Sequence, residues 1–131
     1  MASEFVTFLS EVFAQFGAIR AKRMFGGYGI YHHDLMFGLV ADDLLYLKAD
    51  SQTTPDFDEL GLKPFTFIHR GKTMQMSYYQ APEEIFDDAD EATLWARKAY
   101  QAAVRAQTLK TEKAARTQQK AAAKAKNADR N

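Results

Sequence analysis

The chain has 131 residues, the usual size of one domain, and 47% of them are hydrophobic, which is enough to build a core. It contains no cysteine, which excludes disulfides, thiolate zinc sites and cysteine nucleophiles. Residues 1–104 carry nine Lys/Arg and fifteen Asp/Glu, whereas residues 105–131 carry eight and two, so we predict an acidic domain over residues 1–106 and a basic Lys/Ala-rich tail over residues 107–131.

The first predicted element is an amphipathic helix. Large apolar residues recur with helical spacing at Phe5, Phe8, Leu9, Val12, Phe13 and Phe16. Ser3 is a suitable N-cap and Gly17 a suitable stop. The start of the chain lacks the basic and apolar regions of a signal peptide, and no stretch reaches the ~18 apolar residues of a membrane span. We therefore expect a cytoplasmic protein without membrane contacts.

Three strands are predicted next. The first covers residues 23–31 and is interrupted by glycines, the second covers residues 35–41 and is apolar on both faces, and the third covers residues 44–48. Residues 32–34 and Asp42-Asp43 are polar turns. Because the links are short, the three strands should form an antiparallel meander.

A short helix, a hairpin and a long helix complete the predicted domain. Residues 55–60 form the short helix, which ends at Gly61, and residues 65–68 and 73–78 form a hairpin around Arg70-Gly71-Lys72. The long helix begins near Asp90, and its apolar stripe is small enough to approach a sheet closely: Trp95, Ala99, Ala102, Ala103 and Ala106. The fold class is α+β, with two layers and a five-stranded antiparallel sheet, in the order helix, three strands, helix, two strands, helix.

No pattern identifies a catalytic, cofactor or metal site. The segment Gly26-Gly27-Tyr28-Gly29 lacks the other residues of a phosphate loop and favours a strand with a bulge or a close backbone contact. His32 and His33 are adjacent without a third ligand, and are expected to be an exposed turn pair. We predict that the protein is not an enzyme and needs no cofactor. The alternative is an enzyme whose carboxylates converge only in the fold.

Two features concern partners. Phe65, Phe67, Arg70 and Lys72 interleave aromatic and basic residues, as in a platform for single-stranded nucleic acid. The favoured interpretation is that both phenylalanines face the core, because exposed aromatic rings are costly. The Gly-rich, doubly apolar stretch from residue 25 to residue 40 is more than two helices can shield, which predicts a homodimer or a protein partner there.

The tail favours weak, nonspecific binding of DNA or RNA. Its only acidic residues are Glu112 and Asp129. Its cations are Arg105, Lys110, Lys113, Arg116, Lys120, Lys124, Lys126 and Arg130. On a helix, positions 113, 116, 120 and 124 would form one cationic ridge, although like charges four residues apart oppose helix formation and favour a coil. Phosphate is attracted in either case.

One motif carries a family resemblance. It has two parts, Met24-Phe25-Gly26-Gly27-Tyr28-Gly29 and Met76-Ser77-Tyr78. With these, residues 5–104 resemble the N-terminal domain of the TfoX/Sxy proteins. The resemblance implies a helix-flanked antiparallel sheet like that of secretion-chaperone-like folds, and no catalytic residues. It also implies regulation of genes for natural DNA uptake, as a coactivator beside the cAMP receptor protein.

The chain departs from that family in one respect. Full-length competence regulators carry a second globular domain where this chain has the basic tail. We therefore expect a single-domain, non-enzymatic adaptor in transcription regulation, which acts through protein contacts. A small uncharacterised enzyme and a direct nucleic-acid-binding module are the alternatives.

Overall fold

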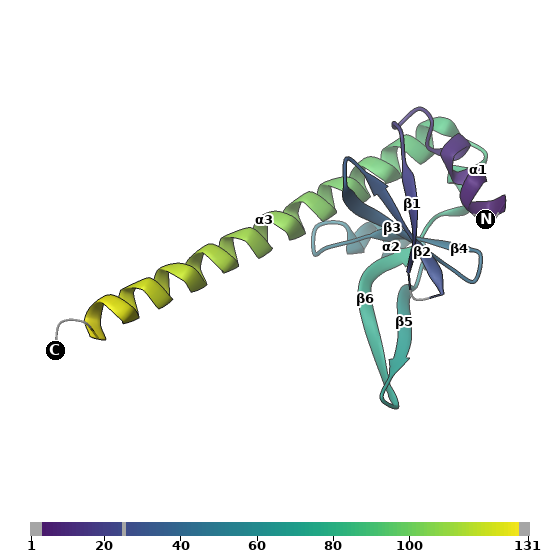
Figure 1. Cartoon of the computed structure of the whole chain (residues 1–131). Helices are drawn as coiled ribbons and strands as arrows, with labels where there is room; N and C mark the ends of the chain where they lie inside the picture. The colour runs from purple at the N-terminus through teal and green to yellow at the C-terminus, as the bar shows by residue number, and fades with distance from the viewer. Residues whose placement is uncertain (1–3, 25, 129–131) are drawn as a thin grey trace.

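The computed structural model describes the backbone of residues 4–24 and 26–128, and side chains as far as residue 119. The first helix, α1 (Glu4–Val12), precedes four strands, which are β1 (Arg20–Met24), β2 (Gly27–His32), β3 (Leu35–Ala41) and β4 (Leu44–Lys48). The helix α2 (Thr54–Glu59) leads into the hairpin β5 (Pro64–His69) and β6 (Lys72–Gln80), and a 3-10 turn η1 (Glu83–Phe86) leads into α3 (Ala89–Ala128). Figure 1 shows this α+β arrangement.

The sheet has six strands in the described residues, in the order β1-β2-β3-β4-β6-β5, and every neighbouring pair is antiparallel. The predicted number of five is wrong because residues 23–31 are not one strand. Met24 pairs with Gly27, so the chain reverses direction between them. Gly26 adopts a φ of 78°, in the left-handed region that favours glycine. The glycine run therefore forms a tight turn at Gly26 and then a close contact between Gly27 and the backbone of the neighbouring strand.

The close backbone contact predicted for this run is confirmed at Gly27. A Cβ at this position would collide with the carbonyl oxygen of Val40 on the neighbouring strand. Strands β3 and β4 have the predicted bounds. The turns that precede them, His33-Asp34 and Asp42-Asp43, hold both residues at positive φ, which is the geometry of two-residue hairpins that match the strand twist.

The helices of the described chain pack their apolar residues against one face of the sheet. Leu9 and Phe13 from the α1 region, Phe57 from α2 and Trp95 from α3 share a buried cluster with Phe37 of β3. The Phe13 and Phe37 rings lie edge to face, with centroids 5.7 Å apart. Burial of each large side chain contributes about 1.5–3 kcal/mol, so this face holds the domain together.

The first helix ends at Val12, before the predicted stop at Gly17, so Phe13 and Phe16 lie in the turns that follow it. The predicted stripe still packs on the core except at one position. Phe8 is 40% exposed, whereas Val6, which lies outside the predicted stripe, is buried. Phe8 and Phe5 both contact the ring of Phe86 from η1, at the rim of the core. The 3-10 turn therefore shifts the buried face of α1 toward Val6. The predicted N-cap, Ser3, lies outside the described residues.

The last helix is longer than the body of the protein. The Asp88 carboxylate accepts hydrogen bonds from the backbone N–H groups of Asp90 and Glu91, which caps the first turn. The alanine stripe is buried against the sheet, as predicted, at Ala99, Ala102 and Ala103. Beyond that contact α3 continues to Ala128 and projects away from the sheet (Figure 1). No helix of the described chain is long and apolar enough to cross a membrane.

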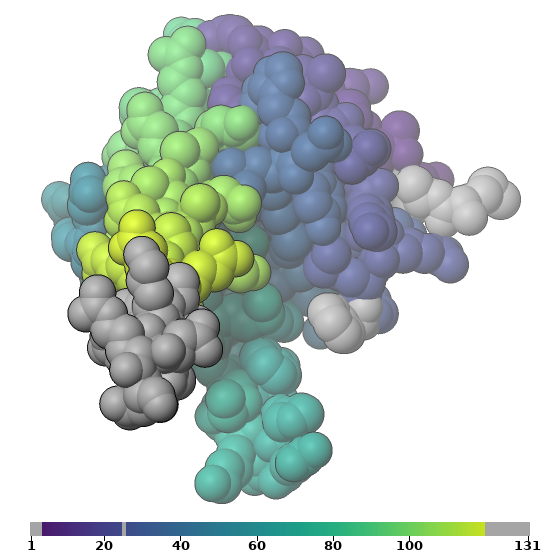
Figure 2. All heavy atoms as spheres, turned by 60° about the vertical axis from the view of Figure 1, so that its left-hand side comes forward, coloured from purple at the N-terminus to yellow at the C-terminus, as the bar shows by residue number. Residues whose placement is uncertain are grey.

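The opposite face of the sheet, called the open face below, carries none of the helices in the described chain. Leu39 and Tyr78 are buried there, outside the cluster that the helices cover. The β5–β6 hairpin extends this face. Only residues 78–80 of β6 pair with β4, so the other residues of the hairpin lie beyond the edge of β4. The rest of the hairpin projects from the body as a two-stranded ribbon (Figures 1 and 2).

The favoured interpretation of the hairpin phenylalanines is wrong. The pairing of β5 with β6 shifts register between Pro64 and Thr66, so Pro64 does not continue the alternation of the residues that follow it. Phe65 then packs edge to face against Tyr46 of the open face, with centroids 5.0 Å apart, and Phe67 is 40% exposed. Both rings therefore lie on the face turned away from the helices.

Candidate functional site

The projecting part of α3 presents the predicted basic surface. Lys110, Lys113 and Arg116 are exposed on it, and Leu109 is 66% exposed, so the described tail side chains pack on no core. Because the helix is continuous, the spacing places residues 113, 116, 120 and 124 on one face of it. The side chains of Lys120, Lys124 and Lys126, and all of Arg130, lie outside the described residues.

Arg105 differs from Lys110, Lys113 and Arg116 because the body of the protein holds it. Its Nε and Nη2 atoms donate to the two carboxylate oxygens of Asp50 at 2.5 and 3.1 Å. This hydrogen bonding holds the pKa of the Asp50 carboxyl below its ordinary value, and the Gln52 amide contributes in the same direction. Asp50 also accepts from that amide at 3.0 Å. The pair anchors α3 where it leaves the sheet.

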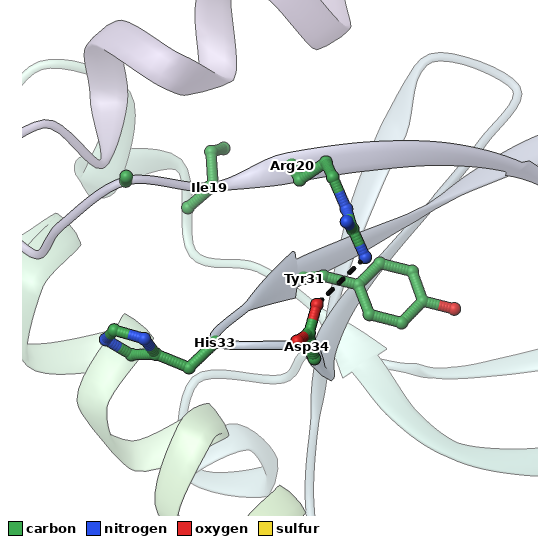
Figure 3. A pocket seen from close by; sticks show the side chains of 6 residues that line it. Ile19, Arg20, Tyr31, His33 and Asp34 are labelled. Atoms are coloured by element: carbon green, nitrogen blue, oxygen red, sulfur yellow. Dashed lines mark hydrogen bonds and ion pairs between the residues drawn. The ribbon is translucent and has the colours of Figure 1, made fainter.

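A hollow of about 170 Å³ lies at the end of the β2–β3 hairpin. It is lined by Ala18, Ile19, Arg20, Tyr31, His33 and Asp34. In Figure 3 the Asp34 carboxylate turns toward Arg20, with which it forms an ion pair at 3.1 Å, and the His33 ring points away from both. Both charged partners are mostly exposed. His33 and Asp34 are therefore neighbours in the sequence, but their side chains point apart and do not form a pair for proton transfer.

His32 is not the exposed turn residue that was predicted. It is the last residue of β2, and its Nδ1 lies 2.7 Å from the Ala18 carbonyl oxygen. Its ring packs between Phe16 and Tyr100, at centroid distances of 4.6 and 5.2 Å. His32 thus joins the end of the first helix to α3. Within the described residues, no three His, Asp or Glu side chains are placed to hold a metal ion.

The two parts of the sequence motif both contribute to the open face. A Cβ on Gly29 would meet the side chains of Met24, Tyr31 and Met36 within 3.1 Å, so this glycine makes room for them. From β6, Tyr78 lies under the ammonium group of Lys48 at 5.1 Å. Phe25, in the first part of the motif, lies outside the described residues.

Burial shifts the acid–base chemistry of this face. It raises the pKa of Tyr78 to about 12, with a smaller contribution from the Tyr31 phenolate. Burial also lowers the pKa of Lys48, against the attraction of Asp50. The tyrosine hydroxyl is therefore neutral at physiological pH. The open face therefore presents aromatic rings and ammonium groups, which can bind a ligand, and does not present an ionised phenol that could act as a base.

Sequence reasoning passed over Tyr46 and Lys48 of the open face. A signal for them exists, because Leu45 and Leu47 alternate with Tyr46 and Lys48 along one strand. Strict alternation places the two pairs on opposite faces. The structure buries Leu45 and Leu47 in the core and leaves the other pair on the open face.

Comparison with known proteins identifies the domain that carries these features. The sequence model of the TfoX N-terminal domain matches residues 11–103. The DNA transformation protein TfoX1 of Aliivibrio fischeri is 31% identical over 67 residues, which are 51% of this chain and 32% of that protein. The DNA transformation protein TfoX of Haemophilus influenzae is 32% identical over 66 residues, 50% of this chain and 30% of that protein. The matched segment thus spans about a third of each relative.

Proposed function

This chain belongs to the TfoX N-terminal domain family, and from that membership we propose that it is a non-enzymatic regulator of DNA transformation. The match of residues 11–103 carries the proposal, because it includes all six strands and the part of α3 that packs on them. Two similar proteins are named for DNA transformation. A regulator of transcription works where the genes are, so we place the protein in the cytoplasm.

Protein contacts are the proposed mode of action. The hairpin supports this mode, since Phe67, Met74 and Met76 are exposed on one side of it and Ile68 on the other. Exposed apolar side chains gathered in one patch favour an interaction site. A catalytic role finds less support, because the hollow near His33 holds an acid that is already paired with Arg20.

The apolar stretch from residue 25 to residue 40 no longer gives a reason to expect self-association. The stretch from residue 25 to residue 40 was expected to need a second chain to cover it. Among the residues that the structure describes, this stretch has no exposed large apolar side chain, and Ile30, Phe37 and Val40 are buried within one chain. We therefore place the protein contacts on the hairpin instead.

The tail supplies a second, weaker activity in this proposal. Lys110, Lys113 and Arg116 stand on an exposed helix, where they can neutralise phosphates and release counterions. The tail offers no rigid set of side chains for reading bases, so its binding of DNA or RNA is independent of sequence. It would hold the regulator near nucleic acid while the domain contacts a protein.

Deletion of the gene in its own bacterium tests the main proposal. We expect lower transcript levels of DNA-uptake genes and a lower transformation frequency, both restored by the full chain. Unchanged transcripts with a lost hydrolytic activity would favour the enzyme alternative. A pull-down from extract, with and without nuclease, then separates the two binding modes. A protein partner that survives nuclease treatment supports an adaptor, whereas a partner lost with the nucleic acid contradicts it.

A further inference from the structure

We propose that the open face of the sheet binds single-stranded nucleic acid. This site is distinct from the tail and goes beyond the regulatory role proposed above. It shares Phe67 with the hairpin surface on which protein contacts are proposed, so a single strand and a protein partner would exclude each other there. It combines three properties of the described residues: the charge of the strands, a row of rings, and the absence of a covering helix.

The strands separate charge sharply. None of the six described strands contains Asp or Glu, although the body outside the tail has a net charge of −6. Five cations lie in the strands, at Arg20, Lys22, Arg23, Lys48 and Lys72. Alternation places all but Arg23 on the open face, together with Tyr31 and Tyr78. The acidic residues lie in helices and loops. The turn residue Asp34 pairs with Arg20, which leaves Lys22, Lys48 and Lys72 to attract a polyanion to this face.

The rings of the open face run from the sheet onto the hairpin. Tyr46 contacts Phe65 at a centroid distance of 5.0 Å, and Phe65 contacts Phe67 at 6.3 Å with an angle of 21° between the ring planes. Phe67 is 40% exposed at the outer end of the row. Partly exposed rings beside cations are the arrangement on which successive unpaired bases stack. Paired bases in a duplex cannot reach the rings in this way.

The cations also decide against a second copy of the chain as the occupant. A twofold interface would place the open face against itself, so the surface that carries Lys22 and Lys48 would face the same cationic surface of the other copy. The described strands offer no carboxylate to pair with them. Like charges across an interface cost several kcal/mol and select against it. A strand of phosphates instead supplies the missing negative charge.

Fluorescence anisotropy of a labelled oligothymidylate of about 12 nucleotides, titrated with the full chain, tests the proposal. We expect Phe67→Ala to weaken binding by about 5- to 150-fold, the range that one stacked base contributes, and Phe67→Tyr to restore it. Phe8→Ala is the matched control, because Phe8 is also 40% exposed but lies on α1, and it should bind like the unchanged chain. Circular dichroism confirms that each variant is folded.

A second variant separates the face from the tail. The triple variant Lys110→Gln, Lys113→Gln, Arg116→Gln should weaken binding to a duplex of the same length. In this variant, Phe67→Ala should still lower the affinity for the single strand by the same factor. The proposal is overturned if Phe67→Ala binds the single strand like the unchanged chain, or if Phe8→Ala loses as much affinity. It is also overturned if light scattering shows a dimer that Phe67→Ala dissociates, because the face would then be a self-interface.

Discussion

Gly27 shows how one residue can set the spacing of two strands. It pairs with Met24 on one side, and on the other its Cα faces the Val40 carbonyl so closely that a side chain has no room. The neighbour is backbone, which cannot rotate out of the way. Glycine is therefore the residue that fits this position of the segment Gly26-Gly27-Tyr28-Gly29.

Substitution Gly27→Ala should therefore destabilise the protein. We expect a loss of at least about 2 kcal/mol, since overpacking against a rigid neighbour forces the strands apart. Urea unfolding followed by circular dichroism measures it. Gly61→Asn is the control, because Gly61 has a φ of 70° but open space around it, and Asn tolerates that conformation at a cost below about 1 kcal/mol. Equal losses in the two variants would contradict the steric explanation.

Asp50 should make stability depend on pH. Its folded pKa lies below the ordinary value of 3.8, chiefly through hydrogen bonding from Arg105, so the unfolded chain binds more protons. The stabilisation is complete above pH 3.8 and is lost as the pH falls through the lowered folded pKa. Asp50→Asn should cost about 1–2 kcal/mol at neutral pH, and the difference should shrink in acid.

Asp34→Asn is the matched control for this pair. The Arg20–Asp34 ion pair has similar partners but is mostly exposed, so its loss should cost less than about 0.5 kcal/mol at any pH. Unfolding curves of both variants at several pH values provide the measurement. A difference for Asp50→Asn that stays constant into acid would rule out the carboxylate as the source of stability.

At the scale of elements, α3 serves two purposes along one helix. Its first part buries an alanine stripe beside Trp95, and its second part is basic and is exposed from residue 107 to residue 119. The Asp50–Arg105 ion pair marks the boundary between them. Helical backbone in the tail spaces the cations regularly, although like charges four residues apart would weaken an isolated helix.

Binding of duplex DNA by the tail should depend steeply on salt. If about three to six cations engage phosphates, log K against log salt should slope at roughly −3 to −5. Deletion of residues 107–131 should abolish this binding, and the Gln variant at positions 110, 113 and 116 should lower the slope without shortening the helix. Electrophoretic or anisotropy titrations at several salt concentrations test it. Equal binding by the truncated protein would show that the tail is not the contact.

At the scale of the whole molecule, two parts project from one acidic body. The basic half of α3 and the apolar β5–β6 hairpin both extend beyond the sheet (Figures 1 and 2). Each exposes side chains that a compact body would bury or neutralise, such as Ile68 on the hairpin and Leu109 on the helix. A regulator that holds a partner and nucleic acid together can use both projections.

The free protein should be a monomer. The helix-covered core is complete within one chain, and the open face opposes a second copy of itself through its cations. Light scattering across micromolar concentrations should give the mass of one chain at every concentration. A mass that rises toward two chains would instead assign the exposed hairpin to self-association, and addition of salt would then strengthen the dimer by screening the cations.

The sequence by itself determined the class of fold, most of the helices and strands, and the family, because helical and alternating patterns are local and each element repeats them. It also placed the basic charge at the tail. Only the tertiary structure decided that the glycine run divides one predicted strand into two, since the division follows from the pairing of Met24 with Gly27 across a turn at Gly26. It likewise decided which face Phe65 and Phe67 occupy, because alternation defines two faces and only the packing of the helices selects the buried one.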